Sequence, residues 1–164
     1  FYKKMITKII SGGQTGADQA GLYAAKHFGI PTGGNMPLDC ITLNGPRVEF
    51  LAEFDMVECQ RKGYPARTEK NVMDSDGTLR FATNFKSAGE KCTLRFIKWH
   101  NKPYFDINPK SPPSVEDVME WIESNNIKIL NIAGNSETTS EGIFKFTYEY
   151  LTELFNAMQV ANRK

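Results

Sequence analysis

The sequence predicts an α/β fold in which a mainly parallel sheet lies between two layers of helices. Two observations lead to this prediction. Short runs rich in β-branched residues, typical of strands, alternate along the chain with longer stretches of helical periodicity. Such alternation implies right-handed crossover connections and a sheet covered by helices on both faces, that is, a three-layer sandwich. The chain has 164 residues and no internal repeat, so we expect a single domain over residues 1–164.

The chain opens on a strand, a glycine-rich turn and a helix. The run Ile6–Ile10 is rich in β-branched residues and predicts a strand that ends near Ser11. Small residues from Ala17 to Phe28 then recur near helical spacing. Gly29 and Pro31 follow, and such residues are typical of a helix end.

The next region is less regular. Glycines and prolines predict a loop over residues 32–46, and residues 48–57 are compatible with either a short strand or a short helix. A short helix is expected over residues 66–73, ahead of a turn-prone Asp-Ser-Asp-Gly sequence at 74–77.

The second half returns to regular alternation. Ser114 is a strong N-cap residue with Asp117 three positions later, so a helix is expected to start directly after the proline-rich connector 108–114. The tail 162–164 is expected to fray. The expected strands are 78–82, 103–107 and 127–133, and the expected helices are 88–99, 115–124 and 141–158.

Composition excludes several classes of protein. Hydrophobic residues make up 40% and charged residues 24%, which is typical of a globular chain. The formal net charge of +1 argues against a nucleic-acid partner, because nonspecific binding to phosphate backbones needs a basic surplus. No run approaches the ~18 apolar residues of a membrane span, so no membrane partner is expected. The opening FYKKMITKII does not resemble a signal peptide.

Cysteine and histidine usage points to a cytoplasmic protein without a structural metal. Cys40, Cys59 and Cys92 are widely spaced, which suggests neither a disulfide framework nor a zinc site. His27 and His100 lie far apart in the sequence, so no histidine-rich metal site is indicated. We therefore expect free thiols in a reducing compartment.

The first candidate site is the glycine-rich turn after the opening strand. Ligands of α/β sheets bind at the carboxyl ends of strands, and a turn there that opens a helix presents N–H groups to an anion. The turn lacks the lysine of a P-loop, which argues against ATP hydrolysis. The alternative is that the glycines only form a tight corner. The candidate residues are Ser11, Gly12, Gly13, Gln14, Thr15, Gly16 and Asp18.

A second candidate segment spans residues 67–76. Its arginine could grip a phosphate or carboxylate, and its aspartates could bind sugar hydroxyls, a metal or a basic partner. A solvated helix face followed by a self-stabilised turn explains the same pattern equally well. The candidates here are Arg67, Thr68, Asn71, Asp74, Ser75 and Asp76.

A third candidate segment, Gly134-Asn135-Ser136, follows an apolar strand and precedes a helix. If this strand neighbours the first one, both turns line one cleft; an ordinary turn is the alternative. No catalytic triad is visible, and Glu90, Glu137 and Glu141 are only weak candidates for general acid–base catalysis.

These segments together resemble a known family. ISGGQTGADQAGL followed by GIPTGG, then YPARTEKNVMDSDGTL, then NIAGNSE with a following GI, are similar to motifs of the molybdenum-carrier family. That family is Rossmann-like. It is related to the lysine decarboxylase-like phosphoribohydrolases and to nucleotide-sensing domains of bacterial defence proteins. The resemblance runs from about Lys8 to Phe155.

The resemblance implies a Rossmann-like domain that binds a phosphate-bearing ligand and forms a homo-oligomer. The ligand implied is the molybdenum cofactor, a phosphorylated pterin, or a nucleotide derivative, and the protein would act as its carrier. Two alternatives stay open: a sequestering or sensing module for nucleotide-derived signals, and a nucleoside-monophosphate phosphoribohydrolase. One departure from the family is the segment 86–91, which has a single glycine where a glycine-glycine-threonine turn is common.

Overall fold

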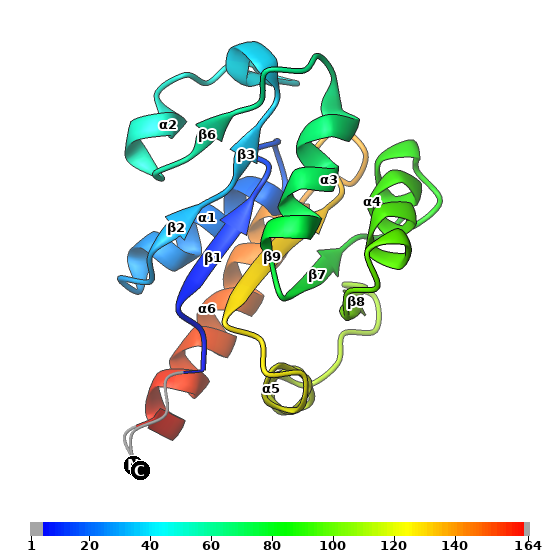
Figure 1. Ribbon diagram of the computed structural model, residues 1–164. Helices are drawn as coiled ribbons and strands as arrows, with labels where there is room; N and C mark the ends of the chain where they lie inside the picture. The colour runs from blue at the N-terminus through cyan, green and yellow to red at the C-terminus, as the bar shows by residue number, and fades with distance from the viewer. Residues whose placement is uncertain (1–4, 163–164) are drawn as a thin grey trace.

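The computed structural model describes residues 5–162 and shows a three-layer α/β sandwich (Figure 1). Its central sheet has five strands in the order β2-β1-β9-β7-β8, and all pairings are parallel. The predicted fold class is therefore confirmed. The five strands are β1 (Lys8–Ser11), β2 (Thr32–Gly33), β7 (Gly77–Phe81), β8 (Tyr104–Ile107) and β9 (Ile129–Gly134).

Helices cover both faces of this sheet (Figure 1). One face is covered by α1 (Ala17–His27), α5 (Val115–Ser124) and α6 (Ile143–Asn162), and the other by α3 (Tyr64–Asp74) and α4 (Ala88–Trp99). Among residues 5–162, no helix is long and apolar enough to span a bilayer.

The strand order becomes familiar when the strands are counted from β9. Taking β9, β1, β2, β7 and β8 as first to fifth, the sheet order reads 3-2-1-4-5, as in the Rossmann fold. The end of α6 packs beside the start of β1, where Met158 and Ile6 share one core and Gln159 donates a hydrogen bond to the Phe28 carbonyl. The fold is thus a Rossmann sheet whose first strand comes last in the sequence. Its topological switch point lies between β9 and β7.

The two faces of the sheet differ in polarity. Because side chains alternate along a strand, Leu79, Leu130 and Ile132 all point to the main core under α1, α5 and α6. Their neighbours Thr78 and Asn131 are also buried, but they face α3 and α4. The inner surface on the α3–α4 side is therefore polar, which is unusual for a packed sheet and suits a binding site.

Residues 32–58 form more structure than the sequence predicted. The expected loop over 32–46 contains β2 and several two-residue strands, and the ambiguous stretch 48–57 contains a short helix. A small separate core of Leu22, Met36, Phe50 and Phe54 holds this region together, and such long-range packing leaves no local periodicity. The elements are β3 (Asn35–Met36), β4 (Ile41–Thr42), β5 (Gly45–Pro46), α2 (Phe50–Glu53) and β6 (Val57–Glu58), with a 3-10 turn at Leu38–Cys40.

Other element boundaries differ by a few residues. The strand predicted over 127–133 starts at Ile129, because the N–H groups of Lys128 and Ile129 bond to the carboxylate of Asp76 at a turn. The last helix extends to Asn162, beyond the predicted end at residue 158, so it includes the first residue of the tail that was predicted to fray. The rest of the predicted frayed tail, residues 163–164, lies outside the described residues.

Candidate functional site

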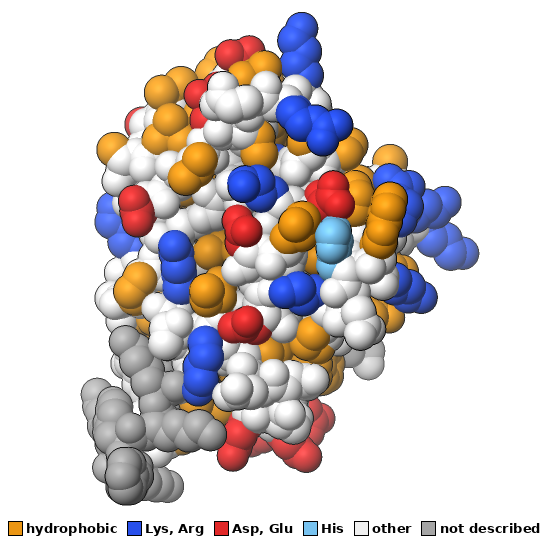
Figure 2. Space-filling model, in the orientation of Figure 1, with side chains coloured by type: hydrophobic (Ala, Val, Ile, Leu, Met, Phe, Trp, Pro, Cys, Tyr) orange, Lys and Arg blue, Asp and Glu red, His pale blue; other side chains and the backbone are white. Residues whose placement is uncertain are grey.

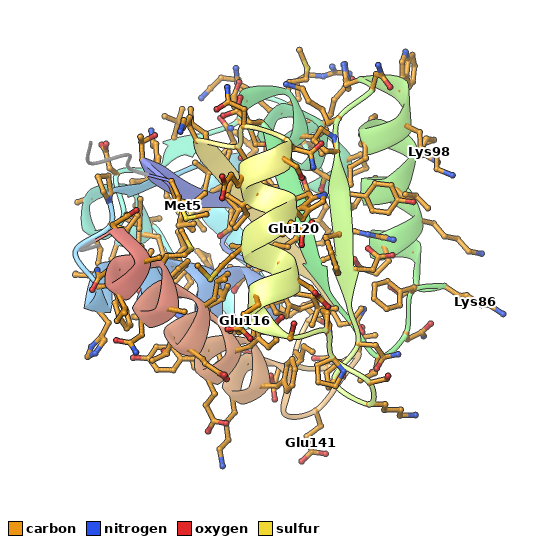
Figure 3. All side chains as sticks on the ribbon, turned by 90° about the horizontal axis from the view of Figure 1, so that it is seen from below. Met5, Lys86, Lys98, Glu116, Glu120 and Glu141 are labelled. Carbon is orange, nitrogen blue, oxygen red and sulfur yellow. The ribbon has the colours of Figure 1, made fainter. Side chains whose placement is uncertain are left out.

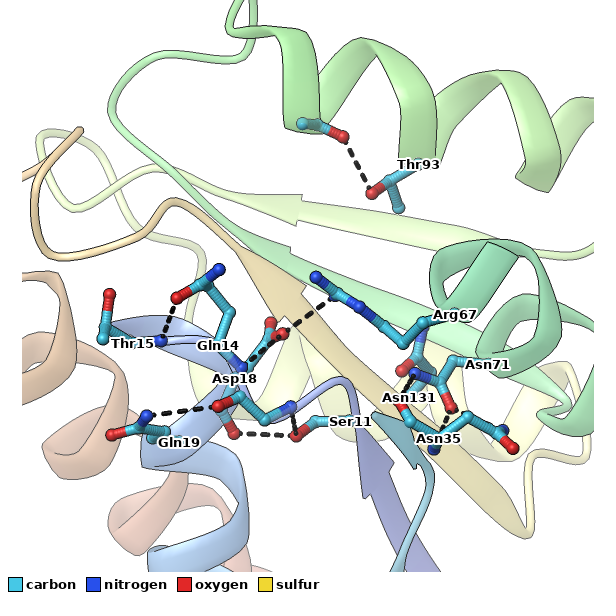
Figure 4. A network of polar contacts seen from close by, with 12 residues as sticks. Ser11, Gln14, Thr15, Asp18, Gln19, Asn35, Arg67, Asn71, Thr93 and Asn131 are labelled. Atoms are coloured by element: carbon cyan, nitrogen blue, oxygen red, sulfur yellow. Dashed lines mark hydrogen bonds and ion pairs between the residues drawn. The ribbon is translucent and has the colours of Figure 1, made fainter. Parts of the chain in front are cut away.

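A cavity of about 400 Å³ lies at the carboxyl ends of β1, β9 and β7, between α3 and α4. This volume falls in the usual range for small-molecule sites. Figure 4 shows the turn after β1, with Gln14 and Asp18, and α3, with Arg67 and Asn71, on one side and Thr93 of α4 on the other. The predicted residues that line the cavity are Gly12, Gln14, Asp18, Arg67, Thr68, Asn71, Gly134, Asn135 and Ser136.

The turn after β1 engages several of its own N–H groups. The N–H of Gln14 donates to Asp18 Oδ2 at 3.3 Å, and that of Thr15 donates to Gln14 Oε1 at 2.9 Å. The N–H of Gly13 donates to the Ser11 hydroxyl at 3.4 Å. Protein side chains therefore occupy acceptor positions that the sequence analysis assigned to an anion.

Glycines in this turn permit close packing of the three candidate segments. A Cβ on Gly12 would clash with the guanidinium of Arg67. Gly16 has a φ of 85° and faces the backbone carbonyl of Asn135. Larger residues at either position would push the second or third segment away from the first. The structure thus places residues of all three segments at one cavity, and the sequence analysis expected this of the first and third segments if their strands were neighbours.

Asp18 and Arg67 form an ion pair at the cavity wall. Arg67 Nη1 lies 3.3 Å from Asp18 Oδ2. Burial raises the pKa of the Asp18 carboxyl to about 6, although Arg67 and the N–H groups of Gln14 and Gly12 act to lower it. Within the described residues, the buried Arg67 Nε has no hydrogen-bond partner. Arg67 therefore keeps donor capacity for a ligand.

Glu90 is a buried carboxyl that sequence reasoning underrated. It lies in the first turn of α4, where the capping hydroxyl of Ser87 accepts its N–H, and its side chain turns inward to line the cavity. Oε2 accepts a bond from Asn135 Nδ2 at 3.4 Å, whereas Oε1 has no partner among the described residues. Burial raises the pKa of Glu90 to about 7, with Arg80 opposing the shift.

Arg80 is a second site-forming residue that sequence reasoning missed. It stands on β7 and is not itself a lining residue, but its side chain, which is 3% exposed, contacts Glu90, which lines the cavity. Nε and Nη2 donate to the two carboxylate oxygens of Asp106 at 2.7 Å, and Nη1 donates to the Glu90 carbonyl at 3.0 Å. The available signal was an arginine inside a predicted strand, because a cation that is buried in a sheet needs an acidic or polar partner nearby.

Asn135 fixes the loop that leads from β7 into α4. Its Oδ1 accepts the N–H groups of Thr83 at 3.0 Å and Asn84 at 3.1 Å, and its Nδ2 donates to the Asn84 carbonyl. The third candidate segment therefore positions the start of α4. In the first turn of α4, Ala88 and Gly89 line the cavity, and their N–H groups have no protein acceptor within residues 5–162.

Several predicted residues lie outside the cavity. Asp76 binds the N–H groups at the start of β9, at the opposite end of the sheet. The Ser75 hydroxyl donates to the Val72 carbonyl, and Asp74 accepts from the Asn35 amide. The remaining predicted residues that do not line the cavity are Ser11, Gly13, Thr15 and Gly16.

Asn71 lines the cavity while it ties α3 to β3. Its Oδ1 accepts the N–H of Asn35 at 2.8 Å, and its Nδ2 donates to the Asn35 carbonyl at 3.1 Å.

No group of three or more His, Cys, Asp and Glu side chains in the described chain is placed to hold a metal ion. The three cysteines are free.

Fold and site together define a Rossmann-like domain with a permuted strand order and, at its switch point, a cavity whose lining includes charged and amide side chains. Residues 9–155 match the model of the circularly permutated YpsA SLOG family, and the chain belongs to this family. It is also similar to a crystal structure from Syntrophus aciditrophicus SB, described as a candidate molybdenum carrier protein. That comparison gives 38% identity and a TM-score of 0.84, over 93% of this chain and 96% of the other. No curated protein matches the chain. The resemblance noted in the sequence is thereby confirmed.

Proposed function

We propose that this protein binds a phosphate-bearing small molecule in the cavity between α3 and α4 and acts as its carrier. One observation carries the proposal. Ala88 and Gly89, whose N–H groups have no protein acceptor among the described residues, lie at the positive end of the 12-residue helix α4 and line the same cavity as Arg67. A phosphate there would accept from two backbone donors and a guanidinium. The turn after β1 then forms the opposite wall, since its own N–H groups already have acceptors.

The rest of the cavity suits a ligand with hydrogen-bond donors. Glu90, whose Oε1 has no partner among the described residues, and Asn131 both line the cavity. Carboxylate and amide oxygens accept hydrogen bonds from N–H groups. A pterin or purine ring presents such donors at its edge. The molybdenum cofactor is a phosphorylated pterin, so its ring donors match these acceptors and its phosphate matches the donors described above. The description of the Syntrophus relative supports this cargo. A nucleotide derivative fits the same chemistry.

Mass spectrometry of the native protein tests the proposal, because a carried ligand copurifies with its carrier. A phosphorylated pterin or nucleotide bound in equal molar amount is expected. Ala88→Pro provides the matched variant: proline at the first helical position keeps the helix and removes one N–H. Ser87 before it is already extended, as a residue before proline must be. Ala88→Ser, which keeps the N–H, is the control. A folded Ala88→Pro protein that retains the full ligand load would contradict the site.

Glu90 favours a second candidate function, hydrolysis of a nucleoside monophosphate to free base and ribose phosphate. A buried carboxyl with a pKa of about 7 in the cavity is suited to general acid–base catalysis near neutral pH. Incubation with nucleoside monophosphates, followed by chromatography for free base, separates the two candidates. Base release that Glu90→Gln abolishes supports the enzyme. Bound but unconverted nucleotide supports the carrier.

A further inference from the structure

Glu90 is a buried carboxylate without a cation partner. It lines the cavity and is 3% exposed, and no Lys, Arg or His among the described residues lies within salt-bridge distance of its carboxylate. Arg80 contacts Glu90, but it donates to the backbone carbonyl and gives its other two nitrogens to Asp106. Exposed carboxylates are placed differently: Glu49 lies 2.7 Å from Arg47, and Figure 2 shows acidic side chains interspersed with basic ones on the face that carries α3.

An anionic ligand alone does not explain this group. A carboxylate that lines the cavity repels a phosphate, and burying it without a partner costs stability. Asp18 is a different case, because Arg67 lies 3.3 Å from its carboxylate. Glu90 therefore points to a part of the ligand that is separate from the phosphate and that donates hydrogen bonds.

Two acceptors in the cavity are held by the protein. Glu90 Oε2 accepts from Asn135 Nδ2 at 3.4 Å, and Asn135 is itself fixed by the N–H of Thr83 at 3.0 Å, whereas Glu90 Oε1 has no partner among the described residues. Asn131 on β9 lines the same cavity, and its Nδ2 donates to Thr78 Oγ1 at 3.2 Å. That bond orients the amide and leaves its Oδ1 as an acceptor for a ligand.

We propose that Glu90 and Asn131 select a ligand ring with a 2-aminopyrimidin-4-one edge, which guanine and the pterins share, over an adenine ring. This edge carries a ring N–H beside an amino group, so it presents adjacent donors to the carboxylate and the amide oxygen. Adenine presents an amino group beside a ring nitrogen that only accepts, and hypoxanthine has the N–H without the amino group. A ring that leaves a buried acceptor unpaired is rejected. The inference rests on the proposed function, since the phosphate of the same ligand binds at Arg67 and the start of α4.

Three nucleotides that differ in the ring edge test this selection. Isothermal titration calorimetry compares GMP, IMP and AMP at pH 8, above the Glu90 pKa of about 7. We expect GMP to bind at least about tenfold more tightly than AMP, with IMP between them. Ribose 5-phosphate, which has no ring, reports on the phosphate site alone.

Two variants test the role of Glu90 in this selection. Glu90→Gln offers one acceptor and one donor, which match the adenine edge, so GMP should bind more weakly, AMP more tightly, and the preference should disappear. Glu141→Gln is the matched control, because Glu141 points outward in Figure 3, and it should keep the wild-type preference. Circular dichroism checks that each variant is folded. The wild-type series decides the selection even if Glu90→Gln does not fold.

The outcomes distinguish this inference from the proposed function. Equal binding of GMP and AMP by the wild type, or tighter binding of AMP, overturns the selection and leaves the phosphate site intact. A preference for GMP that a folded Glu90→Gln protein retains overturns the role of Glu90. Binding of ribose 5-phosphate without binding of any of the three nucleotides also overturns the inference, because the ring then has no place in the cavity. If ribose 5-phosphate and the nucleotides all fail to bind, the phosphate site fails as well.

Discussion

Arg67 Nη1 lies 3.3 Å from Asp18 Oδ2, and this contact joins α3 to the turn after β1 across one wall of the cavity. Both side chains are largely buried: the exposed fractions are 11% for Arg67 and 6% for Asp18. Burial nevertheless outweighs the attraction, since the pKa of Asp18 is raised to about 6. The buried carboxylate of Asp18 therefore costs stability, and a strongly shifted pKa in a cavity marks a candidate functional site.

Removal of Arg67 should destabilise the protein in a pH-dependent manner. In Arg67→Met, the Asp18 carboxylate is left buried without a cation at pH 8, and we expect a loss of about 3 kcal/mol. At pH 5 the carboxyl is protonated, so the loss should be much smaller. Urea unfolding at both pH values measures it. Addition of Asp18→Asn to Arg67→Met should recover most of the loss at pH 8. An equal loss at pH 5 and pH 8 would show that packing, rather than charge, is responsible.

Glu90→Gln should stabilise the ligand-free protein at pH 8. The pKa of Glu90 is raised from 4.5 to about 7, so the unfolded chain loses this proton first as pH rises. Stability falls as pH rises from about 4.5 to 7 and stays reduced above that window. The glutamine variant escapes this loss, and we expect a gain of about 1–3 kcal/mol at pH 8 that disappears near pH 4.

Unfolding of Glu90→Gln and wild type across pH 4–8 gives the difference directly. The matched control is Glu141→Gln, at an exposed position, which should show no pH-dependent difference. A Glu90→Gln protein that is less stable than wild type at pH 8 would contradict the raised pKa.

Anion binding should strengthen as pH falls. With pKa values of about 6 and 7, Asp18 and Glu90 become neutral below pH 6, which removes two negative charges from the cavity. We expect the affinity for sulfate, whose own charge is constant over this range, to rise about tenfold between pH 8 and pH 5, or ~1.4 kcal/mol. Isothermal titration calorimetry measures this change. In Asp18→Asn with Glu90→Gln, affinity should be independent of pH; a persisting slope would place the titrating group elsewhere.

The layers of the fold could be predicted from the sequence, whereas the meeting of the first and third polar segments could be expected only on the condition that their strands were neighbours. Apolar runs and helical periodicity are local patterns, so the strand that carries Leu130 and the helix that follows Ser114 could be predicted. The cavity wall formed by the first turn of α4 was harder to find, because Glu90 resembles any helix-cap glutamate until its burial is known. Asp76 shows the opposite case: its turn-forming role at the start of β9 depends on a partner strand 52 positions away.

Arg80→Lys should test whether the paired guanidinium shapes the site. Arg80 holds both oxygens of Asp106 at 2.7 Å and the Glu90 carbonyl at 3.0 Å. Lysine keeps the charge but cannot bind both Asp106 oxygens and the Glu90 carbonyl at once. The start of α4 therefore loses the hydrogen bond that fixes it to β7. Because Asp106 is 36% exposed, we expect a loss of only about 2 kcal/mol, measured by urea unfolding. Ligand affinity should fall further than this loss of global stability explains, since the free N–H groups of Ala88 and Gly89 depend on that hydrogen bond.

Lys102→Arg, at a cation outside the cavity, is the matched control. If Arg80→Lys and Lys102→Arg bind ligand equally well, Arg80 serves the sheet alone.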